Sequence, residues 1–275
     1  MKTSTGAVLV TGASSGMGKA CALCLDQAGY TVFAGVRKER DACMLKQTAS
    51  SRLIPVTLDV TDERTIAEAF HLIRETVGSA GLVGLVNNAG VGVTAPIELV
   101  PLEELRRQFD INVIGQVAVI QAFLPLIRAA RGRIINISSV GGKITTPFGG
   151  PLCASKYALE SINDALRIEL RPWGIHVVIV APGSIRTPAV DKLVQDSEAM
   201  LKTFPPVGAK RYAAAYRAFV RTFVKQHEEA GAPPPGHGSR RLQSADRHNA
   251  QGSLPGGAFI QAPTTACVLA TPSGV

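Results

Sequence analysis

A glycine-rich turn near the N-terminus constrains this chain most, because it stands between an apolar run and a helical pattern. Residues Ala7–Gly18 read AVLVTGASSGMG, with glycine at Gly12, Gly16 and Gly18, and a helical pattern begins near Lys19. The first amides of a helix lack partners within the helix, and glycine lets the backbone approach a pyrophosphate closely. The turn therefore favours a dinucleotide-binding fold, with a plain structural turn as the alternative.

Apolar runs that suit strands alternate along the chain with amphipathic helical segments. This alternation predicts an α/β fold: a Rossmann-like doubly wound parallel sheet in a single domain, with helices on both faces. The expected strands are Ala7–Val10, Thr31–Ala34, Leu53–Leu58, Leu82–Asn87, Arg133–Ile137 and His176–Val180. The expected helices are about Lys19–Ala28, Asp62–Val77, Leu102–Ala129 and Ala154–Leu170.

Seven motifs follow one another along the chain: TGASSGMG, LDV at Leu58–Val60, NNAG at Asn87–Gly90, Asn112, ISS at Ile137–Ser139, ASK at Ala154–Lys156 and APG at Ala181–Gly183. Their order resembles that of the short-chain dehydrogenase/reductase (SDR) family. Over about residues 6–230 this resemblance implies an SDR Rossmann-like domain, assigned to 1–230, and an oxidoreductase that transfers a hydride between a nicotinamide cofactor and a hydroxyl or carbonyl group.

The resemblance also assigns cofactor-binding roles. The Asp59 carboxylate would receive the adenine amino group beside the Val60 backbone, and Asn87 would hold the neighbouring strand. Each position has a structural alternative: Asp59 could cap the next helix, and a buried asparagine often ties strands together. The cofactor-binding set is Gly12, Ser14, Ser15, Gly16, Met17, Gly18, Arg37, Asp59, Val60, Asn87, Ala89, Gly90, Lys156, Pro182, Gly183, Ile185 and Thr187.

The residue after the second expected strand indicates which nicotinamide cofactor is preferred. In Rossmann-like folds an acidic residue near this point binds the ribose 2′-hydroxyl, whereas an arginine accommodates a 2′-phosphate. Here Val36 stands where NAD-preferring relatives usually carry aspartate, and Arg37 follows it. A planar guanidinium suits a phosphate, so NADP(H) is favoured over NAD(H). The alternative is that Arg37 belongs to a solvated loop.

The resemblance assigns three catalytic positions and exposes one departure. Ser139 would bind the substrate oxygen, Lys156 would bind the nicotinamide ribose and favour phenolate, and Asn112 would disturb its helix and hold a relay water. The general acid/base of the family is a tyrosine four residues before the lysine, one helical turn away. That position is Leu152 in this chain.

Leucine exchanges no proton, so Leu152 predicts severely impaired turnover. Tyr157 is a poor substitute, because five residues along a helix place it on another face than position 152. Cofactor binding would persist, since the glycine turn and Lys156 remain. The alternative reading is a catalytically inactive NADP(H)-binding pseudoenzyme that acts as a sensor or scaffold.

The segment after the last expected strand suggests the class of substrate. By resemblance, residues 189–229 form helices that cover the substrate. Their apolar residues indicate an apolar small molecule, although such stripes more often reflect packing. The residues concerned include Leu193, Met200, Leu201, Phe204 and Phe219.

Composition excludes several other classes of function. The net charge is +8, but the basic residues are scattered without an aromatic-basic stripe, which argues against nucleic acid as a partner. Cys21 and Cys24 form a C-x-x-C on a helix without a second pair, and the histidines do not cluster, so no metal site is expected. No run looks able to span a bilayer, which predicts a cytoplasmic protein. By resemblance it would form a homodimer or homotetramer through its two long helices.

From Gly231 onward the composition changes to Pro, Gly, Ser and Gln with scattered Arg, and periodicity disappears. This composition predicts a disordered tail over 231–275, where relatives carry a further helix and strand. A shifted reading frame over Leu242–Gln261 is one hypothesis for this departure.

Overall fold

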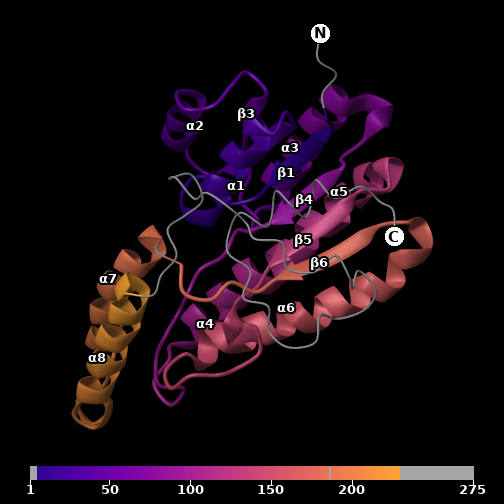
Figure 1. Cartoon of the computed structure of the whole chain (residues 1–275). Helices are drawn as coiled ribbons and strands as arrows, with labels where there is room; N and C mark the ends of the chain where they lie inside the picture. The colour runs from indigo at the N-terminus through magenta and orange to yellow at the C-terminus, as the bar shows by residue number, and fades with distance from the viewer. Residues whose placement is uncertain (1–4, 186, 230–275) are drawn as a thin grey trace.

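In the part of the chain that the structure describes, six parallel strands form one sheet in the order β3-β2-β1-β4-β5-β6 (Figure 1). The computed structural model describes residues 5–185 and 187–229, so the predictions for the tail, 231–275, lie outside the described residues. The fold confirms the predicted Rossmann-like sheet. The strands are β1 (Ala7–Val10), β2 (Thr31–Val36), β3 (Leu53–Thr57), β4 (Gly84–Asn87), β5 (Arg133–Ile137) and β6 (His176–Val180).

Eight α-helices of the described chain accompany this sheet. Leu9 of β1 belongs to a core shared with α3 and α5, whereas Val8 and Val10 belong to a second core shared with α1, so the two faces of the strand are covered by different helices. The helices are α1 (Gly16–Gln27), α2 (Glu39–Lys46), α3 (Glu63–Val77), α4 (Leu102–Phe109), α5 (Gly115–Ala130), α6 (Gly150–Glu169), α7 (Pro188–Lys202) and α8 (Pro206–Glu229).

The helices depart from the sequence prediction at their starts. α1 begins at Gly16 and α6 at Gly150, because glycine and proline, which read as turns, also fit the first turn of a helix. α2 was not predicted. The helix expected over Leu102–Ala129 is instead α4, a π-helical turn at Asp110–Ile114 and α5.

This helical run also corrects the expectation that no segment could span a bilayer. By length and composition alone, Leu102–Ala130 is long and apolar enough to cross a membrane, and 44% of its most apolar window is buried in the fold. The buried side chains of α5, among them Val119, Phe123 and Ile127, join the core against the sheet. Cytoplasmic localisation therefore stays a prediction.

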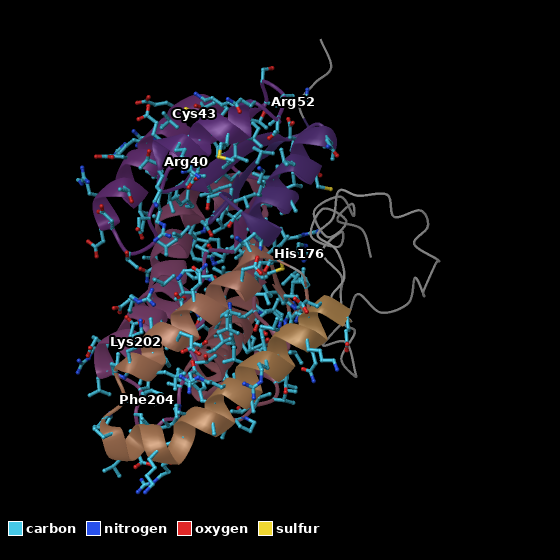
Figure 2. All side chains as sticks on the ribbon, turned by 90° about the vertical axis from the view of Figure 1, so that its left-hand side faces the viewer. Arg40, Cys43, Arg52, His176, Lys202 and Phe204 are labelled. Carbon is cyan, nitrogen blue, oxygen red and sulfur yellow. The ribbon has the colours of Figure 1, made fainter. Side chains whose placement is uncertain are left out.

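Helices α7 and α8 lie side by side and extend away from the sheet (Figure 1). They enclose a separate apolar cluster around Leu201, Phe204 and Tyr216, against which Leu99 and Phe148 pack. In Figure 2 the labelled Lys202 and Phe204 mark the turn between them, at the opposite end of the molecule from α2.

Candidate active site

The glycine turn lies at the carboxyl end of β1, beside the point where the strand order reverses between β1 and β4. Gly12 and Gly16 have φ of 64° and 54°, which glycine adopts without strain. A Cβ on Gly18 would lie 2.3 Å from the Gly12 carbonyl oxygen, so only glycine fits. The first turn of α1 carries no acidic residue, and Ser15 makes no side-chain capping bond. The backbone amides of the glycine turn and of the first turn of α1 therefore form a cradle that fits a phosphate.

Two polar residues that the sequence reasoning did not select hold this turn in place. Thr11 Oγ1 accepts the amide hydrogens of Asn88 and Ala89, each at 3.0 Å. The Asn88 side-chain amide donates to the carbonyls of Thr11 (3.0 Å) and Gly12 (3.1 Å). Thr11 belongs to the motif TGASSGMG and Asn88 to NNAG, and this membership was the sequence signal that could have identified them.

Arg37 and Asp59 come together beside the ends of β2 and β3. Arg37 Nη1 lies 3.9 Å from Asp59 Oδ2, and the Arg37 side chain is 65% exposed, so an anion can reach the guanidinium. Asp59 Oδ1 accepts from the Thr61 amide and hydroxyl and does not cap α3, whose N-cap is Asp62. Val60 is buried.

Asn87 is fully buried at the end of β4 and begins a row of amides across the sheet. Its Nδ2 donates to Asn136 Oδ1 of β5 at 3.0 Å, and Asn136 Nδ2 donates to Asn163 Oδ1 of α6 at 3.0 Å. This contact holds the neighbouring strand, as expected for Asn87. The Ala89 backbone follows beside the glycine turn, since a Cβ on Gly12 would lie 2.8 Å from Ala89 Cα, and Gly90 lies next to Asn112, whose Oδ1 would be 3.3 Å from a Cβ on Gly90.

Asn112 lies in the π-helical turn and is fully buried. Its Oδ1 accepts from the Val91 amide (2.8 Å), and its Nδ2 donates to the Val91 carbonyl (2.9 Å) and to Ser155 Oγ (3.1 Å). Gln108 Nε2 also donates to Ser155 Oγ, which itself donates to the Leu152 carbonyl at 2.8 Å. The helix is thus disturbed at Asn112, as predicted, and polar contacts connect it to the start of α6. No motif or local pattern marks Gln108.

Ser139 lies just after the carboxyl end of β5, and Lys156 lies inside α6. Ser139 caps the 3-10 turn Val140–Gly142, where its Oγ accepts the Gly141 amide at 3.1 Å. Lys156 is buried, and its Nζ donates to the Ile137 carbonyl at 2.8 Å. Burial lowers the pKa of Lys156 to about 8, and the charge of Glu160 acts in the opposite direction.

Leu152 is half-buried in the first turn of α6, four residues before Lys156, and therefore on the same side of the helix. A Cβ on Gly92 would lie 3.8 Å from Leu152 Cδ2, which places the leucine against the loop after β4. Tyr157 is 44% exposed, and its hydroxyl donates to the Lys143 carbonyl. Lys143 ends the 3-10 turn that Ser139 caps, and the exclusion of Tyr157 as a substitute for the missing tyrosine stays a prediction.

The loop after β6 closes the site from the other side. The Pro182 carbonyl accepts the Val140 amide at 3.0 Å, which joins this loop to the turn that carries Ser139. Ile185 is buried. A Cβ on Gly16 would lie 3.6 Å from Thr187 Cβ, so the start of α7 lies against the glycine turn. Gly183 is half-buried in the same loop.

The C-x-x-C on α1 has the character of helix packing. Burial raises the pKa of Cys21 to about 12, which keeps its thiol protonated at neutral pH. The described residues contain no group of three or more His, Cys, Asp or Glu side chains that could hold a metal ion.

A family model described as short chain dehydrogenase matches residues 6–198. The chain belongs to the short-chain dehydrogenase family. Retinol dehydrogenase 5 from Mus musculus is 39% identical over 221 residues, which cover 79% of this chain and 68% of that protein. An NADPH-dependent 3-dehydrocapnine reductase from Ornithobacterium rhinotracheale is 42% identical over 184 residues, 65% of each chain.

Solved structures of short-chain dehydrogenases share the fold. One from Streptomyces avermitilis is 30% identical with a TM-score of 0.64, covering 82% of this chain and 93% of its own. Another, from Burkholderia cenocepacia J2315 in complex with NADP, is 29% identical with a TM-score of 0.62, covering 70% and 78%. This short-chain dehydrogenase is accordingly an SDR-type oxidoreductase.

Proposed function

We propose that this short-chain dehydrogenase transfers a hydride between NADP(H) and a hydroxyl or carbonyl group of an apolar small molecule, and that Leu152 severely slows the reaction. The observation that carries the proposal is the meeting of three features at one edge of the sheet. They are the glycine cradle, the Ser139 hydroxyl and the buried Lys156 ammonium, with a leucine one helical turn before the lysine.

The residues present fit an NADP(H) molecule along this edge. The amides of the glycine turn would hold the pyrophosphate, and exposed Arg37 would hold the 2′-phosphate; an NADP complex of a similar structure supports this preference. Asp59 and Val60 would hold the adenine, and Ala89, Gly90 and Lys156 would hold the riboses. Pro182, Gly183, Ile185 and Thr187 would hold the nicotinamide. The bound cofactor supplies the hydride chemistry.

The chain's own residues orient the substrate and handle the proton. The Ser139 hydroxyl binds the substrate oxygen, and the Lys156 ammonium stabilises negative charge near it. Asn112, held on both sides by Val91, positions the backbone that holds a relay water. Leu152 has no exchangeable proton, so the proton must come from water or from the substrate.

The α7–α8 pair, 189–229, covers the substrate within the domain that we assign to 1–230. Its apolar cluster packs on Leu99 and Phe148 and so borders the loops after β4 and β5. The retinol dehydrogenases among the relatives are named for a long apolar alcohol. We therefore take an apolar alcohol, aldehyde or ketone as the substrate class.

The deciding experiment compares the parent with Leu152→Tyr. NADPH and NADH are first titrated by fluorescence, and turnover is then measured over a panel of apolar aldehydes and ketones that includes retinal. We expect tighter binding of NADPH and, for Leu152→Tyr, a gain of about 10²–10⁴-fold in turnover, the usual contribution of a general acid/base.

Leu152→Phe is the matched control, because it adds the ring without the hydroxyl and should leave turnover at the parent's rate. A parent that works as fast as Leu152→Tyr would refute the assigned role of Leu152. A chain that binds neither cofactor would refute the proposed function as a whole.

A further inference from the structure

A buried carboxylate lies one helical turn beyond Lys156, and the proposed reaction does not use it. Glu160 is 8% exposed and follows Lys156 by four residues on α6, so the two side chains share one helix face. Glu160 Oε2 lies 2.8 Å from Lys143 Nζ, whereas Oε1 is buried without a hydrogen-bond partner among the described residues.

The unpaired oxygen of Glu160 lies toward the catalytic turn. A Cβ on Gly142 would lie 3.1 Å from Glu160 Oε1 and 2.8 Å from Ser138 Oγ, which is also buried and unpartnered. Gly142 closes the turn that Ser139 caps. An ionised carboxylate is costly to bury, and its ion pair with Lys143, which is 63% exposed, satisfies only one of its two oxygens.

The charge of Glu160 favours the charged form of Lys156 and so opposes the effect of burial on its pKa. On α6 the charged group that acts on it is Glu160. The α4 helix and the π-helical turn present the neutral side chains of Gln108 and Asn112 toward α6. The turn after β5 contributes Lys143, and β6 carries His176 at its far, exposed end.

We propose that Glu160 is a positioning residue that keeps the Lys156 side chain charged inside the active site, and that Lys143 tunes this effect from the protein surface. The inference rests on the proposed function in one respect, the contact of Lys156 with the cofactor. Three groups of alternating sign, Lys156, Glu160 and Lys143, run from the interior outward, so the two outer substitutions act on Lys156 in opposite directions. Loss of the carboxylate favours neutral Lys156, whereas loss of the outer ammonium leaves the carboxylate free to favour the charged form.

The test follows Lys156 directly in the protein without cofactor. Lysine labelled with ¹³C and ¹⁵N is titrated by NMR through its side-chain Cε and Nζ signals, and Lys156→Met assigns the signal by its disappearance. In Glu160→Gln we expect the titration midpoint to fall by about 1 pH unit, as for loss of a close opposite charge. In Lys143→Met, an exposed site whose substitution spares the core, we expect a smaller rise.

Lys192→Met is the matched control, since Lys192 is also exposed and ion-paired, at 2.6 Å from Asp196 on α7. It should leave the midpoint unchanged. An unchanged Lys156 midpoint in Glu160→Gln overturns the role of Glu160, and an unchanged or lowered midpoint in Lys143→Met overturns the tuning by Lys143. A merely structural role would not produce shifts of opposite sign.

NADPH titrations over the same pH range separate this inference from the proposed function. We expect NADPH affinity to fall as the pH rises and Lys156 loses its proton. In Glu160→Gln this fall should begin at a lower pH than in the parent, following the lower Lys156 midpoint. Failure of the parent to bind NADPH at any pH would overturn the proposed function while leaving the NMR result to decide the role of Glu160.

Discussion

Lys156 shows how much a single side chain of this protein costs to bury. Its pKa falls from 10.5 to about 8 because the charged ammonium loses its water inside the fold. One strong contact, to the Ile137 carbonyl, and the nearby Glu160 carboxylate offset part of that loss. A buried lysine that destabilises the fold is the expected pattern for a residue retained for its chemistry.

This cost predicts a pH dependence of stability. Between about pH 8 and 10.5 the unfolded chain binds the Lys156 proton while the folded chain does not, so the free energy of unfolding rises with pH over this range. The full effect is about 3 kcal/mol. Urea unfolding of the parent and of Lys156→Met at several pH values measures it.

The difference between the two proteins isolates Lys156, because the other titrating groups are common to both. We expect the parent to gain stability relative to Lys156→Met as the pH rises above about 8. Parallel curves for the two proteins would show that Lys156 carries no such shift.

At the scale of the elements, the π-helical turn Asp110–Ile114 connects the loop after β4 to α6. The extra residue of a π turn rotates the helix locally and turns Asn112 toward Val91 and Ser155. Without that rotation the Val91 amide and carbonyl would need other partners. The turn thus keeps the loop that follows NNAG in place beside the glycine cradle.

Asn112→Ala should therefore destabilise the protein by about 2–4 kcal/mol, because it leaves a backbone donor and acceptor unpaired. NADPH affinity should fall as well, since the loop after β4 would lose its anchor. Chemical unfolding and fluorescence titration measure the two effects. Asp110→Ala is the control, because Asp110 is an exposed residue of the same turn. Equal losses for both variants would contradict the role of Asn112.

At the scale of the whole molecule, the apolar run Leu102–Ala130 can be interpreted either as a membrane-spanning segment or as a core element of the fold. Its composition alone would let it cross a bilayer. In the fold, α5 instead lies in the core that also contains Leu9, Leu85 and Ile134 of β1, β4 and β5. A helix that packs on the sheet in this way contributes its apolar face to folding.

Phe123→Ala tests this placement, because Phe123 is fully buried in that core. We expect a loss of about 3–5 kcal/mol in the free energy of unfolding, typical of a large core side chain. Ile114→Ala, on the same run but at a 60% exposed position, should change stability little. Thermal and urea unfolding measure both, and a Phe123→Ala protein as stable as Ile114→Ala would contradict the packing of α5 on the sheet.

The sequence by itself determined the glycine turn, the six strands and the seven motifs. These are local patterns, because strand periodicity, glycine conformations and motif spacing need no distant partner. It also identified Leu152, since helical spacing relates it to Lys156. Tertiary structure decided the rest. Thr11 and Asn88 hold the glycine turn across 77 residues of chain, Gln108 reaches Ser155, and Glu160 meets Lys143. Such pairs form only when packing brings separate elements together, so a local pattern can mark a residue, as the motifs mark Thr11 and Asn88, without predicting its partner.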